Sequence, residues 1–246
     1  PAQPVEHLRQ PHHPRAERDR GDRRGEQQPA DDDVIAWMDK MHAEGRRVVC
    51  INMGTIYYYQ PQDYAHMVQA LHMIHEQNPN VAFLWKIAQR PKHVQNIPSE
   101  DEAALPPYVR RMSWIPSMTA VMEHPALAVM MHHGGGNSLN ECLAYGIPQF
   151  CISQWVDTHD IGLCIRHSGV GLWSEYSPDF VPEDICSQLL QLVEDKDHTF
   201  RHTALSWKLK TQQAGGTKFA ADLIQSYVTD YTYAGGSSKA PMPHAM

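Results

Sequence analysis

The stretch of residues 130–158, which reads MMHHGGGNSLNECLAYGIPQFCISQWVDT, organises the rest of the chain. It overlaps an apolar run at 127–131 that suits a buried strand. A glycine-rich turn follows at 132–136, and Asn137 and Ser138 are candidate N-caps of a short helix. Unpartnered N–H groups and the helix dipole favour an anion at such a helix N-terminus. The stretch therefore predicts a phosphate site, although many turns of this kind only connect a strand to a helix.

A longer string of polar residues and helix-ending residues makes the prediction more specific. Its members are His133, Asn137, Ser138, Glu141, Gly146, Pro148 and Asp157, preceded by Trp114, Pro116 and His124. Their spacing resembles the signature of family 1 UDP-glycosyltransferases, and the His-His-Gly-Gly start is most similar to fungal members. The resemblance covers residues 34–231 and corresponds to the C-terminal, donor-binding half of such an enzyme.

Composition narrows the class of protein. The chain has 246 residues, a formal net charge of -7 and 42% hydrophobic residues, as expected for a globular protein. No apolar run is long enough to span a membrane, and the polar N-terminus does not read as a signal peptide. The acidic balance argues against a nucleic-acid partner. The cysteines stand apart at 50, 142, 151, 164 and 186, which indicates reduced, buried thiols and a cytoplasmic location.

The order of elements predicts an α/β fold. We expect a disordered segment at 1–32, a donor-binding domain at 33–231 whose first helix is capped by Asp33, and a flexible tail at 232–246. Strands are expected at 47–52, 81–87, 109–114, 127–131, 149–152 and 169–173. Helices are expected at 61–76, 117–123, 158–167, 182–193, 199–213 and 217–231. This alternation predicts a Rossmann-like open parallel sheet with helices on both faces, and the resemblance identifies it as the C-terminal domain of a GT-B glycosyltransferase.

Three candidate site residues lie at equivalent positions relative to the expected strands. Thr55, Trp114 and His133 all lie at or just past expected strand ends, and ligands of open parallel sheets bind beyond these carboxyl ends. The resemblance implies that Gly54 and Thr55 approach the diphosphate. It also implies that Trp114 stacks on uracil, while Ile115 meets the base edge through its backbone.

The resemblance assigns roles to the glycine-rich turn as well. His133 donates an N–H to a diphosphate oxygen, together with the turn through Gly135, Gly136, Asn137 and Ser138. Glu141 accepts both ribose hydroxyls. The competing interpretations are a histidine that caps its own turn and an ordinary surface glutamate. His132 is expected to be structural.

Other positions depart from the plant pattern or allow two interpretations. Asp157 is expected to be a helix N-cap and to accept hydrogen bonds from the sugar, and Thr158 replaces a sugar-selecting glutamine. Ser117 replaces a ribose-binding glutamine and is alternatively a helix cap. Lys86 is interpreted as a solvated strand end, with a role at phosphate as the alternative. These departures, with Gly134 and Gly136 in place of a plant cysteine and tryptophan, leave the sugar unassigned.

The family chemistry implies inverting, metal-independent transfer to a small hydrophobic acceptor, without a cofactor. The expected base lies in an N-terminal domain, so no catalytic residue is assigned here. Three alternatives remain: the donor half of a fungal-type enzyme, a donor-binding subunit with a separate acceptor-binding partner in trans, or a non-catalytic nucleotide-binding module. NAD is disfavoured because no G-x-G-x-x-G follows the first strand.

Overall fold

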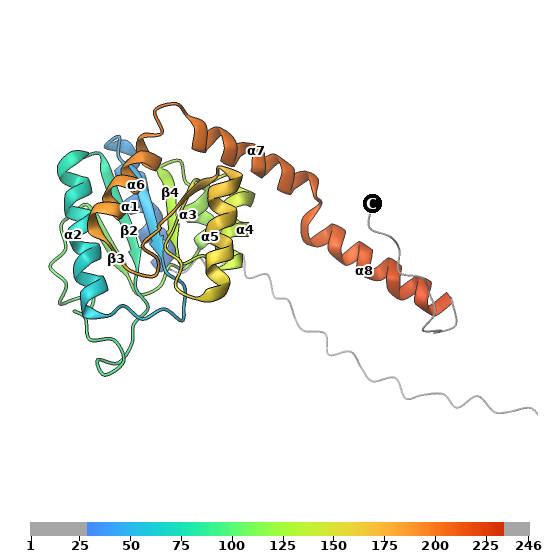
Figure 1. Cartoon of the computed structure of the whole chain (residues 1–246), viewed down its shortest axis with the longest axis horizontal. Coiled ribbons are helices and arrows are strands. Elements are labelled where there is room, and N and C mark those ends of the chain that lie inside the picture. The colour runs from blue at the N-terminus through green and yellow to red at the C-terminus, as the bar shows by residue number, and fades with distance from the viewer. Residues whose placement is uncertain (1–28, 234–246) are drawn as a thin grey trace, which may run out of the picture.

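The computed structural model describes residues 29–233, and Figure 1 shows one α/β domain from which the last helix projects. The strands are β1 (Arg47–Asn52), β2 (Val81–Lys86), β3 (Val109–Met112), β4 (Leu127–His132), β5 (Gln149–Cys151) and β6 (Gly171–Trp173). The helices are α1 (Pro29–Ala43), α2 (Pro61–Gln77), α3 (Met118–Glu123), α4 (Gly136–Tyr145), α5 (Val156–Ser168), α6 (Pro182–Glu194), α7 (Thr199–Gln213) and α8 (Gly216–Tyr233).

The six strands form one sheet in the order β3-β2-β1-β4-β5-β6, and every neighbouring pair is parallel. The direction of winding reverses between β1 and β4, where Asn52 lies beside His132. In open α/β sheets such a switch point leaves a crevice at the carboxyl ends of the strands. The predicted fold class is confirmed, and the switch point lies between the two turns that the sequence selects for phosphate.

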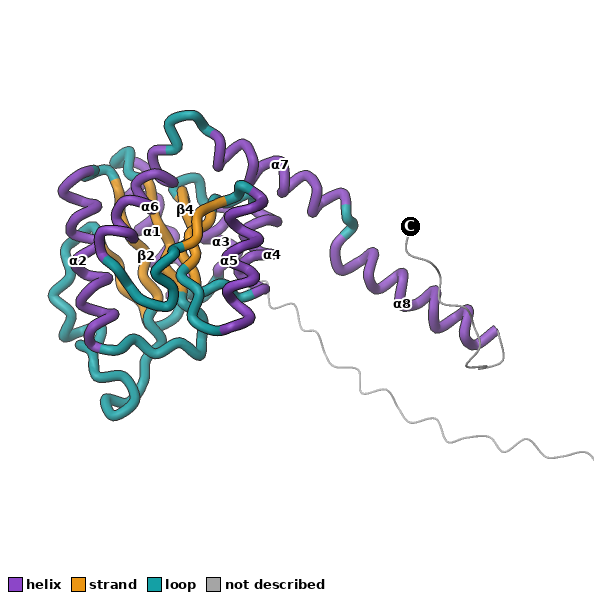
Figure 2. The backbone as a smooth tube through the Cα atoms, viewed as in Figure 1, coloured by secondary structure: helices purple, strands orange, loops and turns teal. Residues whose placement is uncertain are grey.

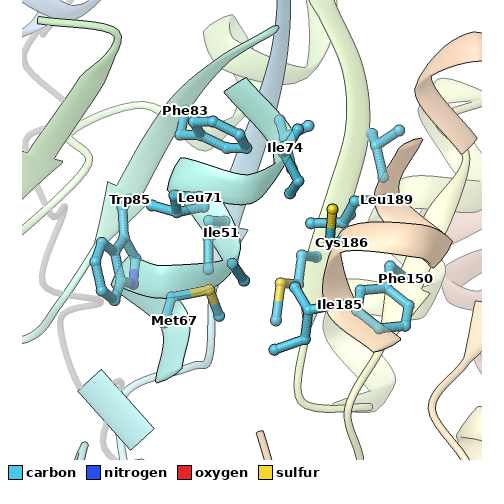
Figure 3. Close-up of a cluster of buried hydrophobic side chains, with 14 of the residues drawn as sticks. Ile51, Met67, Leu71, Ile74, Phe83, Trp85, Phe150, Ile185, Cys186 and Leu189 are labelled. Carbon is cyan, nitrogen blue, oxygen red and sulfur yellow. The ribbon is translucent and has the colours of Figure 1, made fainter. Parts of the chain in front are cut away.

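Helices α2 and α6 cover one face of the sheet. Successive strand side chains point to opposite faces, so Ile51, Phe83 and Trp85 pack on this side against Leu71 of α2 and Ile185 of α6. Figure 3 shows these side chains between the sheet and the two helices. All five are almost fully buried, so they form the apolar core on this side of the sheet.

Helices α1, α3 and α4 cover the opposite face. Val48, Cys50 and Leu84 point to this side and pack against Met38 of α1 and Val121 of α3. Strand residues that point to either face of the sheet are therefore buried. This burial explains why β2 reads as a continuous apolar run, as parallel strands covered on both faces require.

Several element boundaries differ from the sequence prediction, two of them in the first half of the chain. The first helix begins at Pro29, so Asp33 lies inside α1 and the prediction that it caps the helix is wrong. Strand β3 ends at Met112, which leaves Trp114 in the following loop. Residues 1–28 of the segment expected to be disordered, and residues 234–246 of the expected tail, lie outside the described residues.

The last two helices differ in how they pack. Helix α7 packs through Trp207 near Ile165 and Val170. In α8, by contrast, every residue from 216 to 229 is exposed, and Figure 2 shows the helix extending away from the sheet. Among the described residues, no helix is both long enough and apolar enough to cross a membrane.

All five cysteines are free thiols. Cys50, Cys142, Cys151 and Cys186 are buried, and burial raises the pKa of each of these thiols. Cys164 on α5 is exposed, so the prediction of uniformly buried thiols is wrong at this one position.

Candidate functional site

The His133 ring is the centre of the candidate site. A Cβ atom added at Gly54 would lie 2.8 Å from its Cε1, and one added at Gly135 would lie 2.5 Å from its Nε2. Trp155 meets the ring edge-on, with 5.4 Å between ring centroids. We call Gly54, Gly135 and Trp155 the His133 cradle. Any larger side chain at either glycine would collide with the imidazole, so the cradle needs both glycines.

Three strand ends contribute to this cradle. Gly54 follows β1, Gly135 follows β4 and Trp155 follows β5. Gly54 has φ +87°, a conformation that favours glycine, and donates its N–H to Asn52 Oδ1 at 3.0 Å. The structure therefore brings two of the sequence-predicted turns into direct contact at the switch point of the sheet.

The environment of His133 favours the neutral form of its ring. Burial lowers its pKa, Asp157 opposes this shift and Lys86 adds to it. The Nδ1 atom is buried without a hydrogen-bond partner in the described part of the chain. A neutral imidazole carries one N–H donor and one acceptor nitrogen, so the ring can donate to an anion without gaining a charge.

His132 has the structural role that the sequence predicts. Its Nδ1 accepts a hydrogen bond from Gly134 N at 3.0 Å, so its Nε2–H donates to Gln149 Oε1 at 2.9 Å. Burial lowers its pKa to about 4. This second histidine fixes the start of the glycine turn and lies inside the protein.

Helix α4 begins at Gly136, which is earlier than predicted. Its N-cap is Gly135, so Asn137 and Ser138 lie in the first turn and the prediction that they are N-caps is wrong. No side chain caps this end. The first backbone N–H groups of a helix have no partner within the helix, and here they begin beside His133. Glu141 is exposed on the same helix.

Trp114 and its neighbours lie in the loop after β3. Trp114 is 59% exposed, whereas Ile115 is buried. Ser117 accepts a hydrogen bond from Ala120 N at 3.2 Å as the N-cap of α3, so the helix-cap interpretation of Ser117 is confirmed. The exposed indole offers a ring face to an aromatic ligand.

Lys86 corrects the interpretation of the β2 end. It is only 6% exposed, so it is not a solvated strand end. Its Nζ lies 4.8 Å from the centroid of the Trp114 ring and 3.4 Å from Asn52 Oδ1. In the sequence, this burial is indicated by the apolar Ile87, because it continues the buried run on the far side of the lysine.

The loop after β5 is closed by its own hydrogen bonds. Helix α5 begins at Val156, so Asp157 lies in its exposed first turn and the N-cap prediction is wrong. Thr158 is buried, with 2% of its surface exposed. Its Oγ1 accepts from Gln154 N at 3.0 Å and Trp155 N at 2.9 Å, and donates to Trp155 O at 2.6 Å. Thr158 therefore holds the loop that positions Asp157, and its hydroxyl is directed to the loop backbone and not to the carboxyl ends of the strands.

The remaining candidates lie at the edge of this cluster. Thr55 and Gly136 are exposed, and the Thr55 carbonyl accepts a hydrogen bond from Arg90 Nη2. Within residues 29–233, no three His, Cys, Asp or Glu side chains are grouped to hold a metal ion. The elements around the switch point therefore carry backbone N–H groups, the His133 imidazole, a buried lysine and two exposed carboxylates.

A six-stranded parallel sheet with this strand order matches the fold of the C-terminal domain in solved GT-B glycosyltransferase structures. Residues 92–219 match the family described as "Erythromycin biosynthesis protein CIII-like, C-terminal domain". The chain belongs to this family, which has the C-terminal fold of the family 1 UDP-glycosyltransferases.

Three known proteins illustrate the similarity. Erythritol-mannosyl-transferase 1 of Mycosarcoma maydis is 26% identical over 78% of this chain and 41% of its own length. A crystal structure of Os79 from O. sativa in complex with U2F and trichothecene has a TM-score of 0.65 at 18% identity, over 81% of this chain and 44% of that one. A UDP-glucose: anthocyanidin 3-O-glucosyltransferase in complex with UDP has a TM-score of 0.59 at 21% identity, over 74% and 39%. The chain thus spans less than half the length of these relatives.

Proposed function

We propose that this chain is the donor-binding half of an inverting, metal-independent UDP-sugar-dependent glycosyltransferase. The observation that carries the proposal is the His133 cradle. A neutral imidazole with a buried, unpartnered Nδ1 lies between two obligatory glycines, beside the uncapped N-terminus of α4. This arrangement suits a diphosphate, because oxygens with negative charge accept hydrogen bonds from backbone N–H groups at such a position.

Each remaining site residue has one role in the proposal. The exposed Trp114 ring stacks on the uracil, and the backbone of Ile115 meets the edge of the base. Glu141 accepts the ribose hydroxyls, and Asp157 accepts hydroxyls of the sugar. Gly54 and Thr55 on one side, and the turn from Gly135 to Ser138 on the other, lie against the diphosphate.

In the reaction, an acceptor hydroxyl oxygen attacks the anomeric carbon and the bond from that carbon to the UDP oxygen breaks. Negative charge then accumulates on the diphosphate, where the His133 N–H and the α4 N–H groups stabilise it. The proton of the attacking hydroxyl passes to a base in an acceptor-binding domain, which also binds the small hydrophobic acceptor. That domain is supplied in cis or in trans.

A relative's name favours a second candidate for the sugar. The Mycosarcoma maydis protein is named for mannosyl transfer to erythritol, so a mannosyl donor and a small polyol acceptor form the alternative pair. A further alternative is a non-catalytic or split UDP-sugar-binding subunit. A donor panel of UDP-glucose, UDP-N-acetylglucosamine and GDP-mannose separates the sugars.

The first test is calorimetric titration of UDP with and without a chelator of divalent metals. We expect equal affinity in both conditions, and a requirement for magnesium or manganese would contradict metal independence.

Glu141→Ala should weaken UDP binding by about 1–3 kcal/mol, the range for a hydrogen bond to a charged group. The same substitution should hardly change binding of a 2′,3′-dideoxy analogue. Equal losses for both ligands would exclude the ribose contact.

The second test concerns transfer. The chain alone, incubated with labelled donor and a panel of phenols, sterols and polyols, should form no glycoside. Loss of a general base costs about 10²- to 10⁴-fold in rate, and loss of acceptor positioning costs more. Addition of an N-terminal half from a relative should restore transfer for a catalytic half, but not for a non-catalytic module. Turnover by the chain alone would mean that a group such as His159, beside Asp157, serves as base.

A further inference from the structure

We infer that the Lys86 ammonium binds the diphosphate of the donor, opposite His133. The inference rests on the proposed nucleotide-sugar function and adds a residue to it. Lys86 is the last residue of β2, His133 follows β4, and β1 with its Gly54 turn lies between them. Two strand spacings separate the two, on the order of 10 Å. The long lysine side chain and the imidazole therefore approach the same turn from its two sides.

The first argument is the charge balance around the lysine. No carboxylate lies within ion-pair distance of its Nζ in the described part of the chain. Arg90 adds electrostatic repulsion to the Lys86 ammonium, and the neighbouring Cys50 is a buried thiol. A buried ammonium without a counter-charge is unfavourable. Binding of an anion would remove this imbalance.

The second argument is hydrogen bonding. A lysine ammonium has three N–H donors. Its single protein hydrogen bond in the described chain is the long one to Asn52 Oδ1, at 3.4 Å, and the Trp114 ring covers a second direction. At least one donor thus has no protein acceptor, at a place where phosphate oxygens would supply several.

The third argument is that the contacts of Lys86 reach both ends of the site. Asn52 Oδ1, which lies near the Lys86 Nζ, also accepts a hydrogen bond from the Gly54 N–H at 3.0 Å. Gly54 in turn lies against the His133 ring. The Trp114 ring on its other side is the proposed platform for the base. A cation at this point lies between base and phosphates, as the α-phosphate of a bound nucleotide would.

The experiment compares UDP with uridine, which lacks the phosphates. Affinities are measured by calorimetry for UDP and by NMR titration for uridine, on the full chain and on Lys86→Met, Lys86→Gln and Lys40→Met. Lys86→Met keeps the aliphatic length, and Lys86→Gln keeps a donor for Asn52 without the charge. Lys40→Met removes one exposed charge from α1 as the matched control.

We expect both Lys86 variants to weaken UDP binding about 10- to 100-fold, the range for a charge-assisted hydrogen bond. Uridine should change by less than about threefold, and Lys40→Met should change neither ligand. If Lys86→Met does not fold, the same contrast on Lys86→Gln decides. Equal losses for UDP and uridine would show that Lys86 acts only by holding Trp114, and no loss for either would exclude any role. If the unmodified chain binds uridine but not UDP, the proposed function itself fails.

Discussion

The turn after β4 and the loop after β5 lie side by side at the same edge of the sheet, yet they use their polar groups in opposite ways. The turn after β4 leaves His133 Nδ1 without a partner, and no side chain caps the helix that follows. The loop after β5 satisfies its backbone internally through Thr158 Oγ1. The first segment thus keeps polar groups without protein partners, as the proposed diphosphate site requires, whereas the second uses its polar groups to hold Trp155 and Asp157 in place.

The largest effect should come from Gly134→Ala, because Gly134 joins the two segments. Its φ is +87°, and an added Cβ would lie 2.7 Å from the Thr158 carbonyl oxygen. Strain and overpacking together should lower the free energy of unfolding by roughly 2–5 kcal/mol, measured by urea denaturation. Gly136→Ala is the control, since its Cβ would meet open space. Similar losses for both variants would disprove the close contact.

A smaller effect is expected for Thr158→Val, which removes hydrogen bonds only from the loop after β5. The substitution preserves shape but leaves the N–H groups of Gln154 and Trp155 without their acceptor. Unsatisfied buried donors should cost about 2–3 kcal/mol of stability. Thr158→Ser keeps the hydroxyl and should lose less than about 1 kcal/mol. UDP affinity, measured by calorimetry on the folded variant, should change less than about threefold. A large loss of UDP affinity at full stability would instead place Thr158 in the ligand site.

The smallest effect is a pH dependence that separates the two histidines of the turn. The pKa of His132 is about 4 in the folded protein against 6.5 when exposed. The unfolded chain binds the proton more readily, so this contribution to stability is present above pH 6.5 and is lost as pH falls towards 4. Between pH 7 and 6 the loss is on the order of 1 kcal/mol.

His132→Gln should flatten this part of the stability curve, measured by thermal unfolding across the pH range. His133→Gln should flatten it less, because only part of its ring is buried and burial is opposed by Asp157. An unchanged curve in His132→Gln would mean that His132 stays neutral in both states over this range.

The sequence predicted the parallel sheet because each strand is a separate apolar run with clear turn residues around it. It also predicted which turns meet, since Gly54 and His133 follow strands that a Rossmann-like order places together. It missed the helix caps at α4 and α5, because Asn137 and Asp157 suit both an N-cap and a first-turn position. Propensity does not distinguish positions one or two residues apart.

Lys86 and Thr158 show a different limit. Whether a lysine at a strand end is solvated depends on the loop that covers it, and Trp114 comes from a distant part of the sequence. Whether a threonine hydroxyl faces a ligand or its own backbone depends on loop conformation. Both are tertiary properties, so residue type and spacing did not determine them.

The uneven burial of the cysteines has a practical consequence. Four of the five thiols are buried and Cys164 on α5 is exposed. A maleimide fluorophore added under native conditions should therefore attach to Cys164 alone, because attack requires an accessible thiolate. Helix α5 also carries Asp157 in its first turn. The natural sequence thus provides a single-site optical reporter on the helix that carries a residue of the proposed donor site, without removal of any other cysteine.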